Sequence, residues 1–259
     1  MNLKGIKTRI IKVGDDLVKV ILEEIKHAGI EIEDQDIIVV SSKVVALSEG
    51  RIVPLKEIKP SEKALKLAEQ CELPPEFVEI VVREADVIYG GVKGAVLTLK
   101  NGVLQANAGV DRSNAPPGYA ILLPKNPSES ADKIRRGILE RTGKKIAVII
   151  ADSRVQPLRI GSTGVALGVA GFEPVIDERG KEDIYGWKLK HTRRAIADCI
   201  AAAAELIMGE RDEKVPIVLV RDAPVVFTDR KIDASEMVIP IEECMYMGVF
   251  TRSDAHCNL

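Results

Sequence analysis

The sequence predicts an α+β protein with a mixed β-sheet and packed helices, and three observations support this. Short runs rich in Val and Ile at 36–42, 146–151 and 215–220 are typical of buried strands. These runs alternate only in part with segments of helical period. Asn101–Gly102, which lies between two β-prone runs, is a strong hairpin signal. Incomplete alternation together with a hairpin favours a mixed sheet over a regular doubly wound one.

Composition excludes several classes of function. Hydrophobic residues make up 46% of the 259 residues and charged residues 29%, which is typical of a globular protein. Aromatic residues are only 3%, so the core must consist of Val, Ile, Leu and Ala, and modules that stack nucleic-acid bases are disfavoured. The net charge of −2 gives no basic field, so we expect neither nucleic acid nor a membrane as partner.

Cysteine usage and hydropathy predict a cytoplasmic protein. The sequence has no apolar stretch of roughly 18 residues that could span a membrane, and residues 1–11 lack the apolar segment of a secretory signal. The cysteines are scattered without a CxxC pair, which argues against a zinc site or a disulfide framework. They are Cys71, Cys199, Cys244 and Cys257.

The N-terminal part predicts a strand and then a helix. Residues 1–11 are apolar and basic and supply the first strand. Asp15 and Asp16 open a helix over 14–28, with both aspartates in the first turn, where their charge favours the helix dipole. Gly29 suits the left-handed position that follows a helix end.

The next segment continues with a strand and two helices. The strand at 36–42 ends in polar side chains, Ser41 and Ser42, followed by Lys43. Residues 61–70 and 75–86 have helical periods.

A hairpin and a polar loop come next. Runs 95–100 and 103–106 flank Asn101–Gly102 and form the hairpin. The loop at 107–118 has no helical period, and its Asp111 is a candidate oxygen ligand for a metal. The alternative is an ordinary polar loop rich in turn-forming residues. Residues 119–123 then form a short strand, and 130–142 a helix capped by Ser130.

The stretch from 145 to 172 is the centre of the sequence. A buried strand at 146–151 stops at Asp152–Ser153, and a basic, glycine-rich segment with Arg154 and Arg159 follows. Carboxylate and hydroxyl oxygens suit Mg²⁺ or Mn²⁺, while arginines and glycine backbone suit phosphate. The alternative is that Asp152 and Ser153 only cap a turn between two strands.

A helix of small residues follows at 192–208. Its Ala201–Ala204 run fits close packing at a dimer interface or, alternatively, against the protein's own sheet. Residues 215–220 form the last strand. We expect residues 251–259 to be a disordered tail outside the domain.

The sequence contains no Walker A, GxGxxG, HExxH or GxSxG motif, so any nucleotide is bound outside the P-loop scheme. Three polar segments could instead converge on one cation: 41–43, 107–111 and 152–153.

Several motifs, in this order along the chain, resemble the coenzyme F420-0:L-glutamate ligase family. The pair formed by NAGVD-x-SN at 107–114 and ALGVAG at 166–171 is the most specific, and the resemblance extends from about Gly5 to about Arg221. The other matching motifs are GDD at 14–16, SSKVV at 41–45, EGR at 49–51, D-x-YG at 183–186, AD at 197–198 and MGE at 208–210.

The resemblance implies a ligase that joins L-glutamate to coenzyme F420-0 with GTP and a divalent metal, Mg²⁺ or Mn²⁺, with K⁺ as a further ion. It also implies an intertwined homodimer. We expect one such domain over residues 1–250, with two intimately joined subdomains. Asp111, Asp152 and Ser153 resemble the metal ligands. The positions that resemble nucleotide contacts are Thr8, Arg9, Ile10, Ile11, Ser42, Lys43, Leu47, Asn114, Met208, Gly209, Glu210, Arg211, Asp212 and Glu213.

The ligation reaction requires carboxylates that hold a metal and cations that bind phosphate. A carboxylate must be activated before an amine can displace its oxygen, and transfer of the GTP γ-phosphoryl group gives an acyl phosphate. We expect Asp111, Asp152 and Arg159 to be catalytic, with Lys43, Arg112, Arg154 and Arg159 as candidates for binding phosphate or substrate carboxylates.

Two departures from the family pattern keep alternatives open. Leu47 stands where the family commonly has lysine, and Arg154 to Arg159 replace a usual Gly-Arg pair after Asp152–Ser153. The first alternative is a paralogous amide ligase with another carboxylate acceptor. The second is a non-catalytic nucleotide-binding relative, which the two retained carboxylates disfavour.

Overall fold

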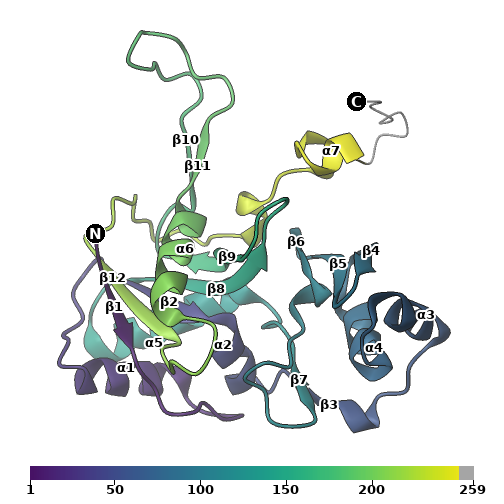
Figure 1. Ribbon diagram of the computed structural model, residues 1–259. Helices are drawn as coiled ribbons and strands as arrows, with labels where there is room; N and C mark the ends of the chain where they lie inside the picture. The colour runs from purple at the N-terminus through teal and green to yellow at the C-terminus, as the bar shows by residue number, and fades with distance from the viewer. Residues whose placement is uncertain (251–259) are drawn as a thin grey trace.

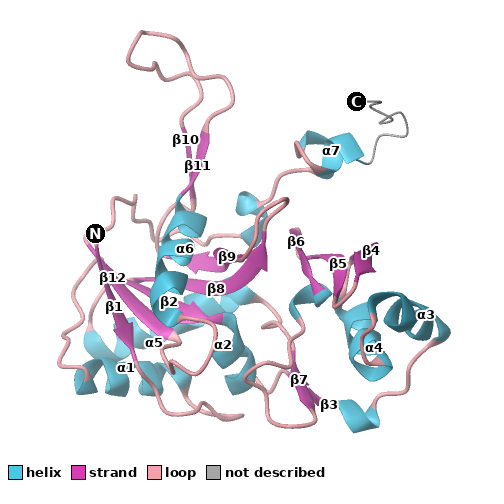
Figure 2. Ribbon diagram, in the orientation of Figure 1, coloured by secondary structure: helices cyan, strands magenta, loops and turns pink. Residues whose placement is uncertain are grey.

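A five-stranded mixed sheet forms the centre of the protein, which a computed structural model describes over residues 1–250 (Figures 1 and 2). The strand order is β1-β12-β2-β8-β9, in which β2 and β8 are parallel and every other neighbouring pair is antiparallel. The predicted α+β class with a mixed sheet is confirmed. The tail at 251–259 lies outside the described residues. The strands are β1 (Asn2–Ile6), β2 (Ile37–Ser41), β8 (Ala147–Val155), β9 (Ser162–Ala170) and β12 (Ile217–Arg221).

Helices cover both faces of this sheet. Helices α1 (Leu17–His27) and α5 (Pro127–Thr142) pack on one face, and α6 (Ile196–Met208) packs on the other. Side chains alternate between the faces of a strand, so Ile38 and Val40 of β2 join the first apolar cluster while Ile37 and Val39 join the second. Burial on both faces explains why β2 and the start of β8 are unbroken apolar runs.

The alanine-rich helix packs against its own sheet. Ala201 and Ala204 are fully buried in the apolar cluster under α6. Gly164 on β9 permits this close approach, because a Cβ atom there would lie 2.3 Å from the carbonyl oxygen of Ala201. Of the two alternatives left open for the Ala201–Ala204 run, the structure therefore supports packing on the sheet.

A third apolar cluster lies beside the main sheet. It joins α3 and α4 to a three-stranded antiparallel sheet, and the Asn101–Gly102 hairpin links two of its strands as predicted. A short pair of strands, β3 and β7, lies nearby in Figure 1. These elements are α3 (Glu62–Cys71), α4 (Pro75–Glu84), β3 (Ile52–Pro54), β4 (Val87–Val92), β5 (Ala95–Lys100), β6 (Val103–Ala106) and β7 (Tyr119–Ile121).

Two boundaries near the central stretch differ from the prediction. Strand β8 does not stop at Ala151 but continues to Val155, because β9 pairs with it as far as Val155 and Ser162. Asp152–Ser153 therefore lies inside a strand and caps no turn. A helix that the sequence analysis missed, α2 (Ser42–Ser48), begins directly after β2.

Three helix starts were also predicted wrongly. Asp16 is the N-cap of α1, where it accepts a hydrogen bond from the Lys19 backbone, so no aspartate lies in the first turn. Asn126, not Ser130, caps α5, which begins at Pro127. Helix α6 begins at Ile196 because the residues before it form a strand instead.

A hairpin arm projects from the body of the protein (Figure 1). Strands β10 (Val175–Asp177) and β11 (Arg193–Ala195) pair at its base. Its tip carries Ile184, Tyr185 and Trp187, which are 90%, 82% and 75% exposed. Exposed apolar side chains on a projecting arm are typical of a protein contact. Short helices complete the C-terminal part, the last being α7 (Met247–Phe250). Among the described residues, no helix has the length and hydropathy needed to cross a membrane.

Gly164→Ala tests the close packing of α6. We expect a loss of roughly 1–3 kcal/mol of unfolding free energy, because the added methyl group must push α6 away from β9. Thr163→Ala, the neighbouring control, adds no Cβ atom. Urea denaturation measures both, and equal stability of Gly164→Ala and the parent protein would contradict the tight contact.

Candidate functional site

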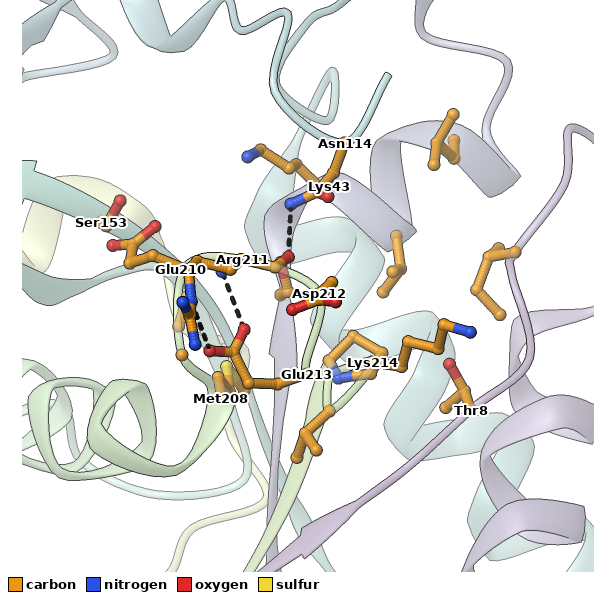
Figure 3. A pocket seen from close by; sticks show the side chains of 18 of the residues that line it. Thr8, Lys43, Asn114, Ser153, Met208, Glu210, Arg211, Asp212, Glu213 and Lys214 are labelled. Carbon is orange, nitrogen blue, oxygen red and sulfur yellow. Dashed lines mark hydrogen bonds and ion pairs between the residues drawn. The ribbon is translucent and has the colours of Figure 1, made fainter. Parts of the chain in front are cut away.

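A cavity of about 530 Å³ opens where β2 ends and the Asp152 segment of β8 passes beside it. This volume is within the usual range for a small-molecule site. Its walls come from the segment after β1, the start of α2, the end of α6 and the loop before β12. Figure 3 shows Asn114 facing the loop that carries Arg211 and Asp212, with Lys43 beside it.

Most of the residues singled out from the sequence meet at this cavity. Asp152 and Ser153 line it together with thirteen of the fourteen positions that resemble nucleotide contacts. The thirteen are Thr8, Arg9, Ile10, Ile11, Lys43, Leu47, Asn114, Met208, Gly209, Glu210, Arg211, Asp212 and Glu213. Asp111, Ser42 and Arg159 do not line it.

Ser42 and Asp111 lie just behind the cavity wall. Ser42 is buried, and its hydroxyl donates a 3.0 Å hydrogen bond to the Asp152 carboxylate. Lys43 binds the other carboxylate. Its ammonium nitrogen lies 2.7 Å from the Asp111 carboxylate and donates a 2.8 Å hydrogen bond to the Ser113 hydroxyl. Two consecutive residues at the start of α2, Ser42 and Lys43, thus contact the two carboxylates among the three predicted metal ligands.

Local structure also fixes Asp111. Its backbone exchanges hydrogen bonds with Ile121, so it is paired to the end of β7. Its carboxylate accepts from the backbone and the hydroxyl of Ser113, at 2.7 and 2.6 Å. Asparagine and aspartate commonly form such turns, which explains why a polar loop can hold a carboxylate in one place.

The two carboxyl groups differ in acidity. Removal from water raises the pKa of Asp152 to about 6, although the Ser42 hydrogen bond and the charge of Lys43 lower it. Burial also raises the pKa of Asp111, but hydrogen bonds from Lys43 and Ser113 outweigh it, so the pKa lies below its ordinary value. Asp111 is thus an anion at neutral pH, while Asp152 is an anion held in a poorly solvated place.

These donors fit a hard divalent cation. Mg²⁺ usually binds one or two protein carboxylates and completes its shell with water and substrate phosphates. Asp111 and Asp152 are two such carboxylates, with the hydroxyl of Ser153 next in sequence. Within residues 1–250 no group of three or more His, Cys, Asp or Glu side chains could form an all-protein metal site. A divalent cation held by these carboxylates would therefore need further oxygen ligands from a substrate.

The loop after α6 closes one side of the cavity. Gly209 has a positive φ of 70°, and a Cβ atom there would lie 2.4 Å from the Glu213 carboxyl carbon. The Arg211 backbone donates to Glu213, and the Arg211 carbonyl accepts a 3.1 Å hydrogen bond from Asn114. This last bond ties the loop to the opposite wall (Figure 3).

The N-terminal segment lies beside that loop. The Thr8 backbone donates a 2.9 Å hydrogen bond to the carbonyl of Lys214. The Arg9 guanidinium lies 2.6 Å from Asp15, which also accepts from the Lys12 backbone. Hydrogen bonding by Arg9 lowers the pKa of Asp15 to about 2, so this ion pair persists over the physiological pH range.

The remaining arginine candidates lie away from the cavity. Arg159 is exposed in the turn between β8 and β9. Arg112 lies over the ring of Phe77, 5.0 Å from its centroid. Arg154 is half-buried on β8, and its Nε atom has no hydrogen-bond partner. The catalytic role predicted for Arg159 stays a prediction.

Sequence reasoning missed two charged residues of the cavity. Glu205, near the end of α6, and Lys214, in the loop before β12, both line it. The only signal for Glu205 was one acidic residue within the apolar run AAAAELIM.

Comparison with known proteins agrees with the motifs. The sequence pattern of the F420-0:gamma-glutamyl ligase family matches residues 5–222. A coenzyme F420:L-glutamate ligase from Methanothermobacter thermautotrophicus is 43% identical over 216 residues, covering 83% of this chain and 86% of that protein. Proteins of the same name from Methanopyrus kandleri and Archaeoglobus fulgidus are 42% and 40% identical over 214 and 212 residues, and both alignments cover 82% of this chain and 83% of the relative.

Asp152→Asn should stabilise the protein in metal-free buffer at neutral pH. An acid whose pKa is raised on folding binds its proton more tightly in the folded state, so its ionised form weakens the fold above the folded pKa. Asparagine removes this cost, on the order of 1–3 kcal/mol. The gain should shrink as pH falls through about 6 and disappear below the ordinary aspartate pKa.

Thermal unfolding over a pH series measures this, with Asp212→Asn, on the exposed loop, as the control. A pH-independent difference between Asp152→Asn and the parent would mean that the Asp152 carboxyl is not desolvated.

Proposed function

The chain belongs to the F420-0:gamma-glutamyl ligase family, and from this premise we propose that it adds L-glutamate in γ-linkage to coenzyme F420-0, using GTP. The family makes the protein a ligase that forms amide bonds. One observation carries the rest of the proposal. Asp152 and Lys43, which is paired with Asp111, line a cavity whose walls contain nearly all the positions that resemble nucleotide contacts.

GTP would occupy this cavity between the N-terminal segment and the loop after α6. The cations Arg9, Lys43 and Lys214 line the cavity and suit a polyphosphate. The link from Asn114 to the Arg211 carbonyl lets the loop close over a bound molecule. The chain then supplies binding and orientation, which are the main needs of phosphoryl transfer.

Asp111 and Asp152, with Ser153, would hold Mg²⁺ or Mn²⁺ together with phosphate oxygens, and K⁺ is a further ion we propose. Such a cation would neutralise the negative charge that develops on the transferred phosphoryl group. Ser42 keeps the Asp152 carboxylate oriented through its 3.0 Å hydrogen bond. Lys43 pairs with Asp111 in the structure and lines the cavity, so it would be available to phosphate once that carboxylate has another partner.

The reaction proceeds in two steps. A carboxylate oxygen of the acceptor attacks the γ-phosphorus of GTP, and GDP leaves with the electron pair of the broken bond. The glutamate amine then attacks the acyl carbon, the new C–N bond forms, and phosphate leaves. No enzyme nucleophile is required, in keeping with a cavity that holds no cysteine or histidine among its described residues.

A paralogous amide ligase remains the second candidate. Leu47 lines the cavity, so a leucine at the position where the family commonly has lysine changes the site itself, and any charged contact that the lysine makes is lost here. A different carboxylate acceptor would fit such a change.

We also propose that the protein forms an intertwined homodimer through its projecting arm. Ile184, Tyr185 and Trp187 expose large apolar surfaces at the arm's tip. Ala201 and Ala204 do not contribute to this dimer interface, because both side chains are buried within their own subunit.

The central test is incubation with coenzyme F420-0, GTP, Mn²⁺ and L-glutamate. We expect mass spectrometry to find successive additions of glutamyl units. Asp111→Asn and Asp152→Asn should fold but lose roughly 100-fold or more in rate, because each removes an anionic ligand worth several kcal/mol in the transition state.

Glu140→Gln, an exposed change on α5, is the control and should keep the parent rate. Near-normal ligation by both aspartate variants would refute the metal role. Ligation of another carboxylic acid, but not of coenzyme F420-0, would establish the paralogue instead.

The arm is tested by sedimentation. We expect a dimer for the parent protein and a monomer for a Tyr185→Ser, Trp187→Ser double variant. Trp187 is the only tryptophan, so its fluorescence should shift to shorter wavelength as concentration rises and the ring leaves water. A parent protein that is monomeric and fully active at micromolar concentration would contradict the dimer.

A further inference from the structure

Glu205 lies near the end of α6, in the wall of the cavity that Asp152 also lines. It is the one carboxylate in the stretch AAAAELIM at 201–208 of α6, which is otherwise alanine and larger apolar residues. Its Oε1 atom is buried and has no hydrogen-bond partner. A buried polar atom without a partner costs stability, so this oxygen at the cavity wall is available to a ligand.

The position of Glu205 is fixed by its neighbours. Helix α6 packs closely on β9 through Gly164, which leaves the helix end little freedom to move. The Glu210 carboxyl group interacts directly with Glu205, and Glu210 is in turn held by a 2.9 Å hydrogen bond from Ser162 of β9. Two carboxyl groups in contact share a proton more readily than they both ionise.

The charged surroundings support a proton-accepting role. Burial first, and Glu210 second, raise the pKa of Glu205 to about 7, with a further contribution from Asp152 of β8, while the Ser162 hydroxyl lowers it. The other charged side chains that line the cavity are Arg9, Lys43, Arg211, Asp212, Glu213 and Lys214. A carboxylate of this kind is both a stronger base than an ordinary one and still available at neutral pH.

The proposed reaction needs such a base. L-Glutamate in neutral water carries an ammonium group, which has no lone pair and cannot attack an acyl phosphate. Within the described residues no histidine lines the cavity. Asp152 is held by Ser42, and Asp111 by Lys43. Among the described residues, Glu205 is the cavity carboxylate with a buried oxygen that has no hydrogen-bond partner.

We propose that Glu205 is the general base that removes a proton from the ammonium group of the incoming glutamate. This inference rests on the proposed ligase function. The Glu205 oxygen takes one ammonium proton, and the freed lone pair forms the C–N bond at the acyl carbon. The C–O bond to phosphate then breaks, and phosphate leaves with the electron pair of that bond and with the second proton that the nitrogen loses to become an amide. Glu210, held by Ser162, is a positioning residue that sets the basicity of Glu205.

The test separates activation of the carboxylate from attack by the amine. Hydroxylamine is largely uncharged at neutral pH and traps acyl phosphates as hydroxamates without help from a base. Glu205→Gln should therefore form hydroxamate from coenzyme F420-0 and GTP at close to the parent rate. Its ligation of L-glutamate should fall by roughly 100-fold or more, the usual contribution of a general base. Glu140→Gln should retain both activities.

The pH profile gives a second readout. The rate of glutamate ligation by the parent should fall on the acid side as Glu205 takes up its proton. Glu210→Gln removes the carboxyl group that raises the Glu205 pKa, so the acid limb should move to lower pH. A purely structural role of Glu210 would lower the rate without moving that limb.

Each failure has a distinct meaning. Parent-like glutamate ligation by Glu205→Gln, or equal loss of hydroxamate and glutamate products in a folded Glu205→Gln, would overturn the base assignment. If Glu205→Gln does not fold, an unmoved acid limb in Glu210→Gln overturns it. A parent protein that forms neither product would instead refute the proposed function.

Discussion

Burial of β2 and β8 on both faces is the constraint on which the rest of the structure depends. Helices α1 and α5 on one side and α6 on the other leave no solvated face, so the paired residues 37–40 of β2 and 147–150 of β8 are all apolar. Their parallel register pairs Ser41 with Ala151. Ser42 and Asp152 follow directly, and this places the serine hydroxyl within 3.0 Å of the carboxylate. A slip of one residue would turn Asp152 to the opposite face of the sheet.

The same burial raises the free-energy cost of holding a charged group at the site. Asp152 continues an apolar strand and is poorly hydrated, which its raised pKa reflects. Asp111 avoids this cost because Lys43 and Ser113 satisfy its carboxylate. The protein thus holds one well-paired and one poorly compensated carboxylate side by side. An arrangement that costs stability without a ligand is typical of sites that gain their counter-charge when substrate binds.

The cavity has two walls of different chemistry. One, at α2 and β8, carries Asp152 and Lys43, which is paired with Asp111, and suits phosphate with its cation. The other, at the end of α6, carries Glu205 and Glu210 and suits a group that must lose a proton. Gly164 links them, because its missing side chain lets α6 approach the strand that pairs with β8. Close packing of a helix therefore decides how far apart the two walls lie.

By itself the sequence determined the features that depend on neighbouring residues: the buried strands, the hairpin at Asn101–Gly102 and the motifs that meet at the cavity. Only the tertiary structure decided that Asp152 lies inside β8, since that depends on pairing with β9. It also decided that Arg159 lies in an exposed turn and that Glu205 faces the cavity. The physical reason is that strand pairing and desolvation arise from residues far apart in sequence, which no local pattern records.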